Sequence, residues 1–203
     1  TAQAYITTDN NANQITTFHP GAMQFSHEVK IPHDQSITLG LISPDGRDGM
    51  IEHTKQLIEM NTPYIFDPGQ GMPMFNKDEL NFFTENASWI VMNDYEFKMY
   101  NEITNISSKD ITKKNKTLVV TNGDKGSTIF TNSSELHIPT PKVKDPKDPT
   151  GCGDAYRAGI IYGINNKMDL QKIGERSSEL GALKVKSFGT QNHIFGDRIR
   201  KLL

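Results

Sequence analysis

The chain of 203 residues contains a single cysteine, no long hydrophobic run and no large excess of either charge. One cysteine cannot form an internal disulfide, which is typical of proteins from a reducing compartment. No apolar run approaches the ~20 residues that cross a bilayer, and no basic-then-apolar segment opens the chain, so we predict a cytoplasmic protein with no membrane partner. The net charge of −2 argues against a nucleic-acid partner.

What the chain does have is a regular alternation of short apolar runs and segments with helical spacing. Strands are expected at residues 37–42, 63–66, 88–92 and 117–120, with a polar hairpin after the last of them. Helices are expected at 47–61, 76–86 and 96–103, and over most of the chain after residue 154 apart from a loop near 188–192. This alternation predicts an α/β fold with a mostly parallel sheet of the Rossmann type.

Two further segments are predicted from composition. Residues 4–8 and 14–18 are rich in threonine, isoleucine and aromatics around a turn-prone stretch, which indicates an antiparallel hairpin. The charged stretch 108–116 is expected to be a loop or a frayed helix end. Polar residues follow three of the predicted strands, at Asp67, Asn93 and Thr121, which is the edge where α/β sheets bind ligands.

The strongest motif is Asp148–Ala155, which runs directly into an apolar helical stretch. The start of a helix offers unpaired backbone N–H groups and the positive end of the helix dipole, so it attracts anions. We predict that the amides of Gly151, Cys152 and Gly153 form an anion hole for a phosphate. An acidic side chain beside a phosphate suits a general base, and Asp154 is the candidate to deprotonate an attacking hydroxyl.

Other interpretations of this motif are open. Aspartate is a frequent helix cap, so a plain capped loop explains an isolated Gly-x-Gly-Asp. A dinucleotide-binding site fits poorly, because no acid-ended strand follows ~20 residues later. A helix N-terminus is expected to lower the pKa of the Cys152 thiol, although no histidine is adjacent to make it a nucleophile.

The motif Asp148–Ala155 resembles the signature of the ribokinase-type (PfkB) carbohydrate and nucleoside kinases. Three other segments resemble elements of that family: Asn93–Glu96 its Asn-x-x-Glu element, Thr121–Gly126 its Thr-x-Gly-x-x-Gly loop, and Asp67–Gln70 its Asp-Pro element. The resemblance implies a ribokinase-like sandwich with a small β-lid, of which residues 4–18 are part. It also implies a kinase with an alcohol group as acceptor, using ATP.

The resemblance assigns further roles by position. Asp154 is the catalytic base, while Gln70 and Arg157 lie near the substrate. Asn93 and Glu96 organise Mg²⁺; as oxygen ligands they suit that ion, although the same pair also describes an ordinary helix cap. The residues expected to contact ATP are Thr121, Gly123, Gly126, Asn93, Thr150, Gly189 and Gln191.

Within the family, Asn93–Glu96, Arg157 and Gly189–Gln191 favour the bacterial-type adenosine kinases. The predicted reaction therefore moves the γ-phosphoryl of ATP to the 5′-hydroxyl of adenosine. A sugar kinase acting on ribose or fructose and a non-catalytic nucleotide-binding remnant are the alternatives. A requirement for K⁺ and a homodimer through the lid are left open.

One departure from the family concerns the beginning of the chain. Residues 2–23 resemble a segment that follows the first third of a family member, the part that carries the sugar-binding motif and most of the small β-lid. We therefore expect residues 1–203 to be a single α/β kinase domain that lacks this N-terminal third.

Overall fold

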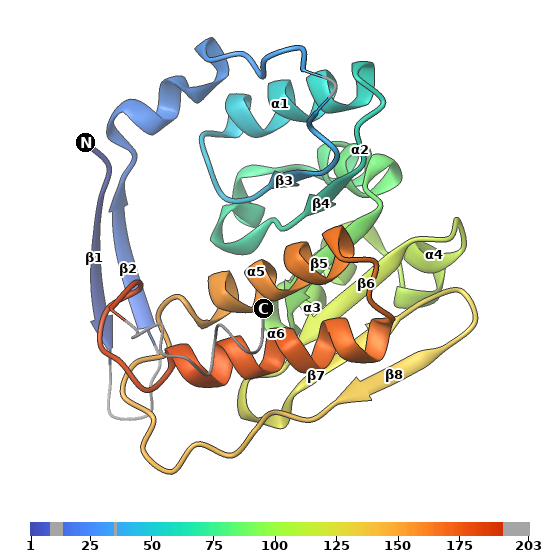
Figure 1. The fold of residues 1–203 in the computed structure, drawn as a ribbon. Coiled ribbons are helices and arrows are strands. Elements are labelled where there is room, and N and C mark those ends of the chain that lie inside the picture. The colour runs from blue at the N-terminus through green and yellow to red at the C-terminus, as the bar shows by residue number, and fades with distance from the viewer. Residues whose placement is uncertain (9–13, 35, 193–203) are drawn as a thin grey trace. The chain divides into compact units, whose positions relative to one another are not determined.

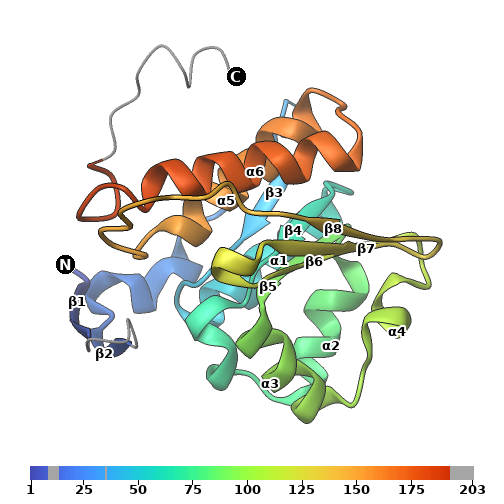
Figure 2. The same cartoon turned by 90° about the horizontal axis from the view of Figure 1, so that it is seen from below.

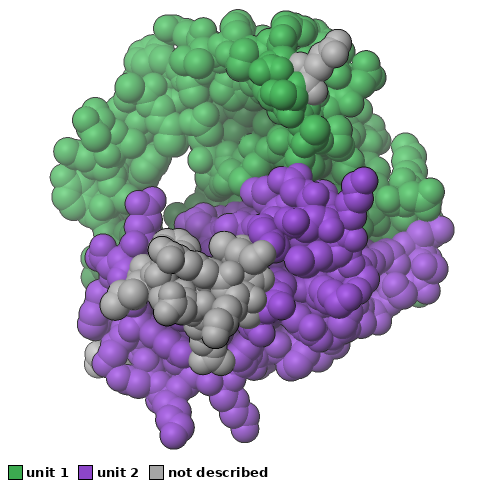
Figure 3. All heavy atoms as spheres, in the orientation of Figure 1, with its two compact units in different colours: residues 1–119 green, residues 120–203 purple. Residues whose placement is uncertain are grey.

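A computed structural model describes residues 1–8, 14–34 and 36–192 of the chain (Figure 1). Two compact units are present, residues 1–119 and residues 120–203 (Figure 3). Within the part of the chain that is described, no helix is both long and apolar enough to cross a bilayer.

The first unit begins with an antiparallel ribbon and continues as alternating strands and helices. Its elements are β1 (Gln3–Thr8), β2 (Gln14–His19), the 3-10 helix η1 (Gly21–Glu28), β3 (Gly40–Ile42), α1 (Arg47–Glu59), β4 (Tyr64–Phe66), the 3-10 helix η2 (Gly69–Met74), α2 (Lys77–Asn86), β5 (Trp89–Asn93), α3 (Asp94–Thr104), α4 (Ser108–Thr112) and β6 (Thr117–Thr121). The boundary between the two units falls within β6.

The second unit contains one hairpin and two long helices. Its elements are the 3-10 turn η3 (Gly123–Lys125), β7 (Ser127–Phe130), β8 (Glu135–Ile138), α5 (Cys152–Asn165) and α6 (Leu170–Lys184). The predicted polar hairpin is confirmed by β7 and β8, which pair antiparallel.

The strands of the main sheet follow the order β3-β4-β5-β6-β7-β8, and β1 and β2 form a separate two-stranded sheet. Strand β4 is parallel to both β3 and β5. The expected α/β class with a mainly parallel sheet and a small antiparallel ribbon near the N-terminus is confirmed. That this ribbon is part of a lid, and that the chain is a single domain, stay predictions.

Aromatic packing on β4 builds the core of the first unit. All three residues of β4 are buried. The ring of Phe66 stacks on Phe83 of α2 at 4.7 Å between centroids, and Phe75 meets Phe83 edge-on at 4.9 Å. The hydroxyl of Tyr64 donates to the backbone oxygen of Phe83 at 2.6 Å, so the one polar atom of this buried ring is satisfied.

Helices α5 and α6 of the second unit run side by side (Figure 2). They approach closely because glycines face the partner helix: a Cβ on Gly159 would lie 2.6 Å from the Cα of Ser177. Helix α5 is also joined to the hairpin, since the buried hydroxyls of Tyr156 and Ser127 are 2.7 Å apart. The first turns of α5 are therefore held in place by close packing against α6 and by a hydrogen bond to β7.

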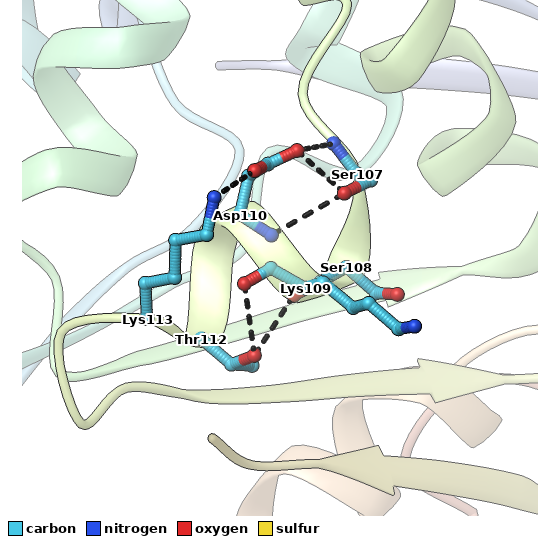
Figure 4. A network of polar contacts seen from close by, with 6 residues as sticks. All are labelled: Ser107, Ser108, Lys109, Asp110, Thr112 and Lys113. Carbon is cyan, nitrogen blue, oxygen red and sulfur yellow. Dashed lines mark hydrogen bonds and ion pairs between the residues drawn. The ribbon is translucent and has the colours of Figure 1, made fainter.

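Two element predictions were wrong in detail. The strand expected at 37–42 covers only Gly40–Ile42, because its neighbour β4 begins just after Pro63, which has no N–H to donate. The stretch expected to be a loop or frayed end contains helix α4, stabilised by a capping box between Ser107 and Asp110 (Figure 4).

The capping box of α4 is a local, exposed feature. The ammonium of Lys113 donates to Asp110 at 2.6 Å and, together with Ser107, holds the pKa of the Asp110 carboxyl below its usual value.

Candidate active site

The predicted site residues are divided between the two units. Gln70, Asn93 and Glu96 lie in residues 1–119, and the other predicted residues lie in residues 120–203. The second unit carries the phosphate motif.

Helix α5 begins as the motif predicts, immediately after Gly151. Gly151 has φ +85°, a left-handed conformation that favours glycine. A Cβ at this position would also lie 3.1 Å from the backbone oxygen of Thr190. Both the backbone conformation and the short distance require a glycine. The short distance also shows that the backbone of Thr190 lies next to the start of α5.

The three amides predicted to form the anion hole differ in their bonding. The Cys152 amide donates to the backbone oxygen of Pro149 at 3.0 Å. The amides of Gly151 and Gly153 belong to the part of a helix start where no carbonyl of the same helix is available. These two amides can therefore donate hydrogen bonds to an incoming anion. The role of all three amides stays a prediction.

Asp154 lies in the first turn of α5, and 71% of its side chain is exposed. Its Oδ1 accepts a hydrogen bond from the Arg157 guanidinium, which lies one turn further along the helix. Arg157 is largely covered, with 18% of its side chain exposed, so it fixes the orientation of the more exposed carboxylate. The structure thus places two predicted site residues in direct contact.

The carboxylate of Asp148 connects the two segments around the loop. Its Oδ1 accepts from the Thr150 amide at 2.9 Å and its Oδ2 accepts from the Gly189 amide at 2.8 Å. The bonds from Thr150, which outweigh the opposing effect of burial, lower the pKa of the Asp148 carboxyl. Thr150 and Gly189, both predicted to contact ATP, are thereby joined through a residue for which no role was predicted.

Lys184, the last residue of α6, lies directly behind this loop. Its side chain is fully buried, and its ammonium donates to the backbone oxygens of Asp148 and Ser187. We expected no role for it from the sequence, because lysine is normally read as a surface residue. Its spacing along α6 is the signal that could have revealed it: Ser177 lies four residues after Ile173, and Lys184 lies seven residues after Ser177, all on the buried face.

The expected lowering of the Cys152 pKa is wrong. Burial raises the pKa of this thiol, and the nearby Lys184 charge only partly opposes that effect. The thiol therefore stays protonated at neutral pH, which fits a small residue of the loop rather than a nucleophile.

The segment Thr121–Gly126 forms a tight turn between β6 and β7. The Asn122 amide donates to the Gly126 oxygen at 2.7 Å, which closes the turn. Gly126 has φ +97°, and a Cβ there would lie 2.1 Å from the backbone oxygen of Ile138. The glycines are thus required by the backbone itself, and ATP contacts at Thr121, Gly123 and Gly126 stay predictions. The same holds for Gln191, which is exposed at the end of the described chain.

In the first unit, Asn93 and Glu96 form a reciprocal capping box at the start of α3. Asn93 Oδ1 accepts from the Glu96 amide at 2.7 Å, and Glu96 Oε2 accepts from the Asn93 amide at 2.8 Å. Amide and carboxylate oxygens carry further lone pairs, so this pair fits contact with Mg²⁺ through its bound waters. In the described part of the chain, no three His, Cys, Asp or Glu side chains gather as a metal site.

Gln70 lies in the wall of a cavity of about 1100 Å³ within the first unit. Apolar side chains of β2, η1 and η2 line it together with charged residues at the start of α1, namely Asp45 just before the helix and Arg47 and Asp48 in its first turn. A mostly apolar cavity with a few polar groups is typical of a small-molecule site. This surrounding supports the prediction that Gln70 lies near a substrate.

Comparison with known proteins gives one family and several relatives. The sequence profile described as pfkB family carbohydrate kinase matches residues 1–194. A nucleoside kinase of Methanocaldococcus jannaschii is 31% identical over 194 residues, covering 96% of this chain and 64% of the relative. A ribokinase of Bacillus subtilis is 27% identical over 130 residues, covering 64% of this chain and 42% of the relative.

The solved structure of a nucleoside kinase of Burkholderia thailandensis in complex with inosine is similar, with a TM-score of 0.90 and 42% identity. The match covers 95% of this chain and 63% of that one. The same kinase in complex with ADP-inosine matches with a TM-score of 0.89. The chain thus spans less than two thirds of the length of these nucleoside kinases.

Proposed function

This chain belongs to the pfkB family of carbohydrate kinases, and from that premise we propose that it acts as an ATP-dependent kinase of a nucleoside. The γ-phosphoryl of ATP moves in line to a primary hydroxyl of the acceptor. The observation that carries this proposal is the exposed carboxylate of Asp154 in the first turn of α5, next to the amides of Gly151 and Gly153.

Each group at the start of α5 has a distinct part in the transfer. Arg157 holds Asp154 Oδ1, which leaves Oδ2 to accept the proton of the attacking hydroxyl. The amides of Gly151 and Gly153, at the positive end of the helix dipole, stabilise the negative charge that develops on the transferring oxygens. The turn at Gly123 and Gly126 and the segment at Gly189 are the proposed contacts of the nucleotide.

Asn93 and Glu96 are the residues proposed to hold Mg²⁺. When bound with ATP, the ion neutralises negative charge on the phosphate oxygens. The two side chains would hold the hydrated ion through their oxygens while keeping the capping bonds at the start of α3.

The acceptor is proposed to be a purine nucleoside, with adenosine the acceptor favoured by the sequence. Two relatives are named nucleoside kinases, and one of them is solved with inosine. The apolar cavity beside Gln70 is of a size and character that suits a flat base. A sugar kinase is the second candidate, because the chain is also similar to a ribokinase.

The test of this proposal is ADP release from Mg·ATP with adenosine, inosine, ribose and fructose as separate acceptors. The longest available form of the protein is used, and its mass is verified. We expect turnover with adenosine or inosine and much less with the free sugars. Turnover with a free sugar alone would show that the acceptor is a sugar and not a nucleoside. No turnover with any acceptor would favour a non-catalytic nucleotide-binding protein.

Replacing Gly153 with valine is expected to weaken ATP binding without unfolding the protein. The three atoms nearest to a Cβ at this position all belong to the Arg157 guanidinium, the nearest being its Nη1 at 3.1 Å, and that flexible group can shift. The branched side chain then shields the amides. We expect the ATP dissociation constant, measured by isothermal titration calorimetry, to rise at least about tenfold, the equivalent of one hydrogen bond to a charged group.

Ala158→Val is the matched control, since it adds the same branched side chain at an exposed position of the same helix. It is expected to bind ATP as the unmodified chain does. Equal ATP affinities in the two variants would mean that the start of α5 does not contact phosphate.

A further inference from the structure

The wall of the cavity beside Gln70 carries a guanidinium, that of Arg47, to which the proposed function assigns no part. Among the described residues that line this cavity, Arg47 is the only lysine or arginine, and its side chain is 44% exposed. It occupies the first position of α1, where a positive charge opposes the helix dipole. The stability of α1 therefore does not explain an arginine at this position.

Two carboxylates hold this guanidinium in place. Its Nη1 donates to Oδ1 of Asp48, the next residue, at 3.0 Å, and its Nη2 donates to Oε1 of Glu79 in the first turn of α2. Glu79 is itself fixed, because its Oε2 accepts from the Asn76 amide in the capping box of α2 and only 19% of its side chain is exposed. The guanidinium is therefore oriented before a ligand binds.

The remaining donors of Arg47 are available to a ligand in the cavity. A guanidinium carries several N–H donors in one plane, of which the bonds to Asp48 and Glu79 use only two. Such a planar fork matches a ligand that has two neighbouring acceptor atoms in one plane. The side chain is thus suited to bind a flat group through two hydrogen bonds.

The charges around Arg47 decide between an anionic and a neutral ligand. Asp45 and Asp48 line the same cavity, and Glu79 contacts the guanidinium, so three carboxylates accompany one positive charge. This excess of negative charge repels a phosphate or a free carboxylate. A neutral ligand with two acceptor atoms, such as the edge of a nucleoside base, is favoured instead.

Purine bases differ at the edge that such a fork recognises. The 6-oxopurine base of inosine or guanosine presents two acceptors, O6 and N7, which arginine binds together. Adenine also presents N7, but its N6 is a donor and opposes a second N–H donor. Gln70 does not separate the two bases, because its amide can turn to offer either a donor or an acceptor. Of these two polar side chains, only Arg47 discriminates.

We propose that Arg47 determines the base specificity of this chain, and that it favours 6-oxopurine nucleosides over adenosine by donating to O6 and N7. This inference rests on the proposed function, since it requires that the cavity beside Gln70 receives the base of the acceptor. It names inosine and guanosine as the acceptor class, whereas the sequence motifs favour adenosine.

The first arm of the test measures nucleoside binding to the unmodified protein by calorimetry, without ATP. Inosine is compared with 7-deazainosine, which lacks the N7 acceptor, with purine riboside, which lacks O6, and with adenosine. We expect inosine to bind at least about tenfold more tightly than each of the others, the value of one hydrogen bond to a charged group. Equal affinities for inosine and 7-deazainosine would overturn the proposal, as would a failure of all four nucleosides to bind.

The second arm removes the guanidinium. Arg47→Met keeps an unbranched side chain without any N–H donor, and we expect it to bind inosine and 7-deazainosine within about twofold of each other. Arg47→Lys keeps the charge without the planar fork, so it is expected to lose most of the preference as well. An unchanged preference for inosine over 7-deazainosine in Arg47→Met would show that another residue contacts N7, and the proposal would be wrong.

Arg176→Met is the matched control. Arg176 is similarly exposed, at 36%, and its guanidinium lies 3.0 Å from Glu179, so its replacement removes a comparable ion pair in the second unit. This variant is expected to retain the full preference for inosine. The same loss of preference in both methionine variants would contradict a specific contact between Arg47 and the base.

Kinetics separates this inference from the proposed function. With Mg·ATP, we expect Arg47→Met to lose at least about tenfold in kcat/KM for inosine and to change by less than about twofold for adenosine. If no phosphoryl group is transferred to any nucleoside, the proposed function fails, while the binding measurements still decide the role of Arg47. If the unmodified protein transfers it with equal kcat/KM to adenosine and inosine, the proposed function holds and this inference fails.

Discussion

Asp154→Asn is expected to lower kcat by about 10²–10⁴-fold, the usual cost of removing a general base. Asparagine has nearly the same shape but cannot accept the proton of the attacking hydroxyl. ATP affinity is not expected to weaken, because the substitution removes a negative charge from beside the phosphate. Rates are measured as ADP release under saturating Mg·ATP, and affinity by calorimetry.

The fold should tolerate this change. The Asp154–Arg157 pair is exposed on the aspartate side, and such pairs contribute about 0–1 kcal/mol to stability. Asp145→Asn is the control: Asp145 is also exposed, contacts Lys147, and has no proposed role. Turnover of Asp154→Asn at the rate of the unmodified enzyme, with Asp145→Asn unchanged, would exclude Asp154 as the base.

Gly159→Ala is expected to destabilise the second unit by roughly 1–3 kcal/mol, the typical cost of overpacking a close contact. The added Cβ would lie 2.6 Å from the Cα and 2.9 Å from the backbone nitrogen of Ser177, which are atoms that cannot rotate away. Helices α5 and α6 must therefore move apart. The free energy of unfolding is measured by denaturant titration.

The matched control is the same substitution at Gly181 on the neighbouring helix. A Cβ there meets only the backbone oxygen of Cys152, at an ordinary contact distance of 3.6 Å. Since alanine restricts the unfolded chain and favours the helix, Gly181→Ala is expected to stabilise by about 0.4–1 kcal/mol. The two variants should thus change stability with opposite signs, and a shift in the same direction would contradict the packing argument.

Most helices and strands could be predicted because their apolar residues recur with a clear period. The strand predicted at 37–42 is longer than the observed β3, because the apolar pattern of one segment does not show where its partner strand begins. Here the partner β4 begins only after Pro63. Helix α4 was missed for the opposite reason: its signal is the capping pair Ser107 and Asp110, not an apolar face. Local hydrogen bonds therefore define α4, which hydrophobic periodicity does not indicate.

The candidate site shows a similar division. Gly151–Asp154 could be identified because the motif encodes a backbone shape, and the left-handed Gly151 is present as required. Asp148 and Lys184 were not assigned roles, since their contacts join residues 36 positions apart. Such a contact depends on how α6 returns to the loop, which no short window of sequence contains.

The capping box at the start of α3 has a consequence for the order in which metal and nucleotide bind. Asn93 and Glu96 already use one oxygen each to complete the helix, so together they present a weak and incomplete ligand set. Mg²⁺ also retains most of its hydration shell and takes its strongest ligands from phosphates. We therefore expect the free ion to have little affinity for the empty protein and to enter as a preformed complex with ATP. Free ATP in excess over the metal should then act as a competitive inhibitor.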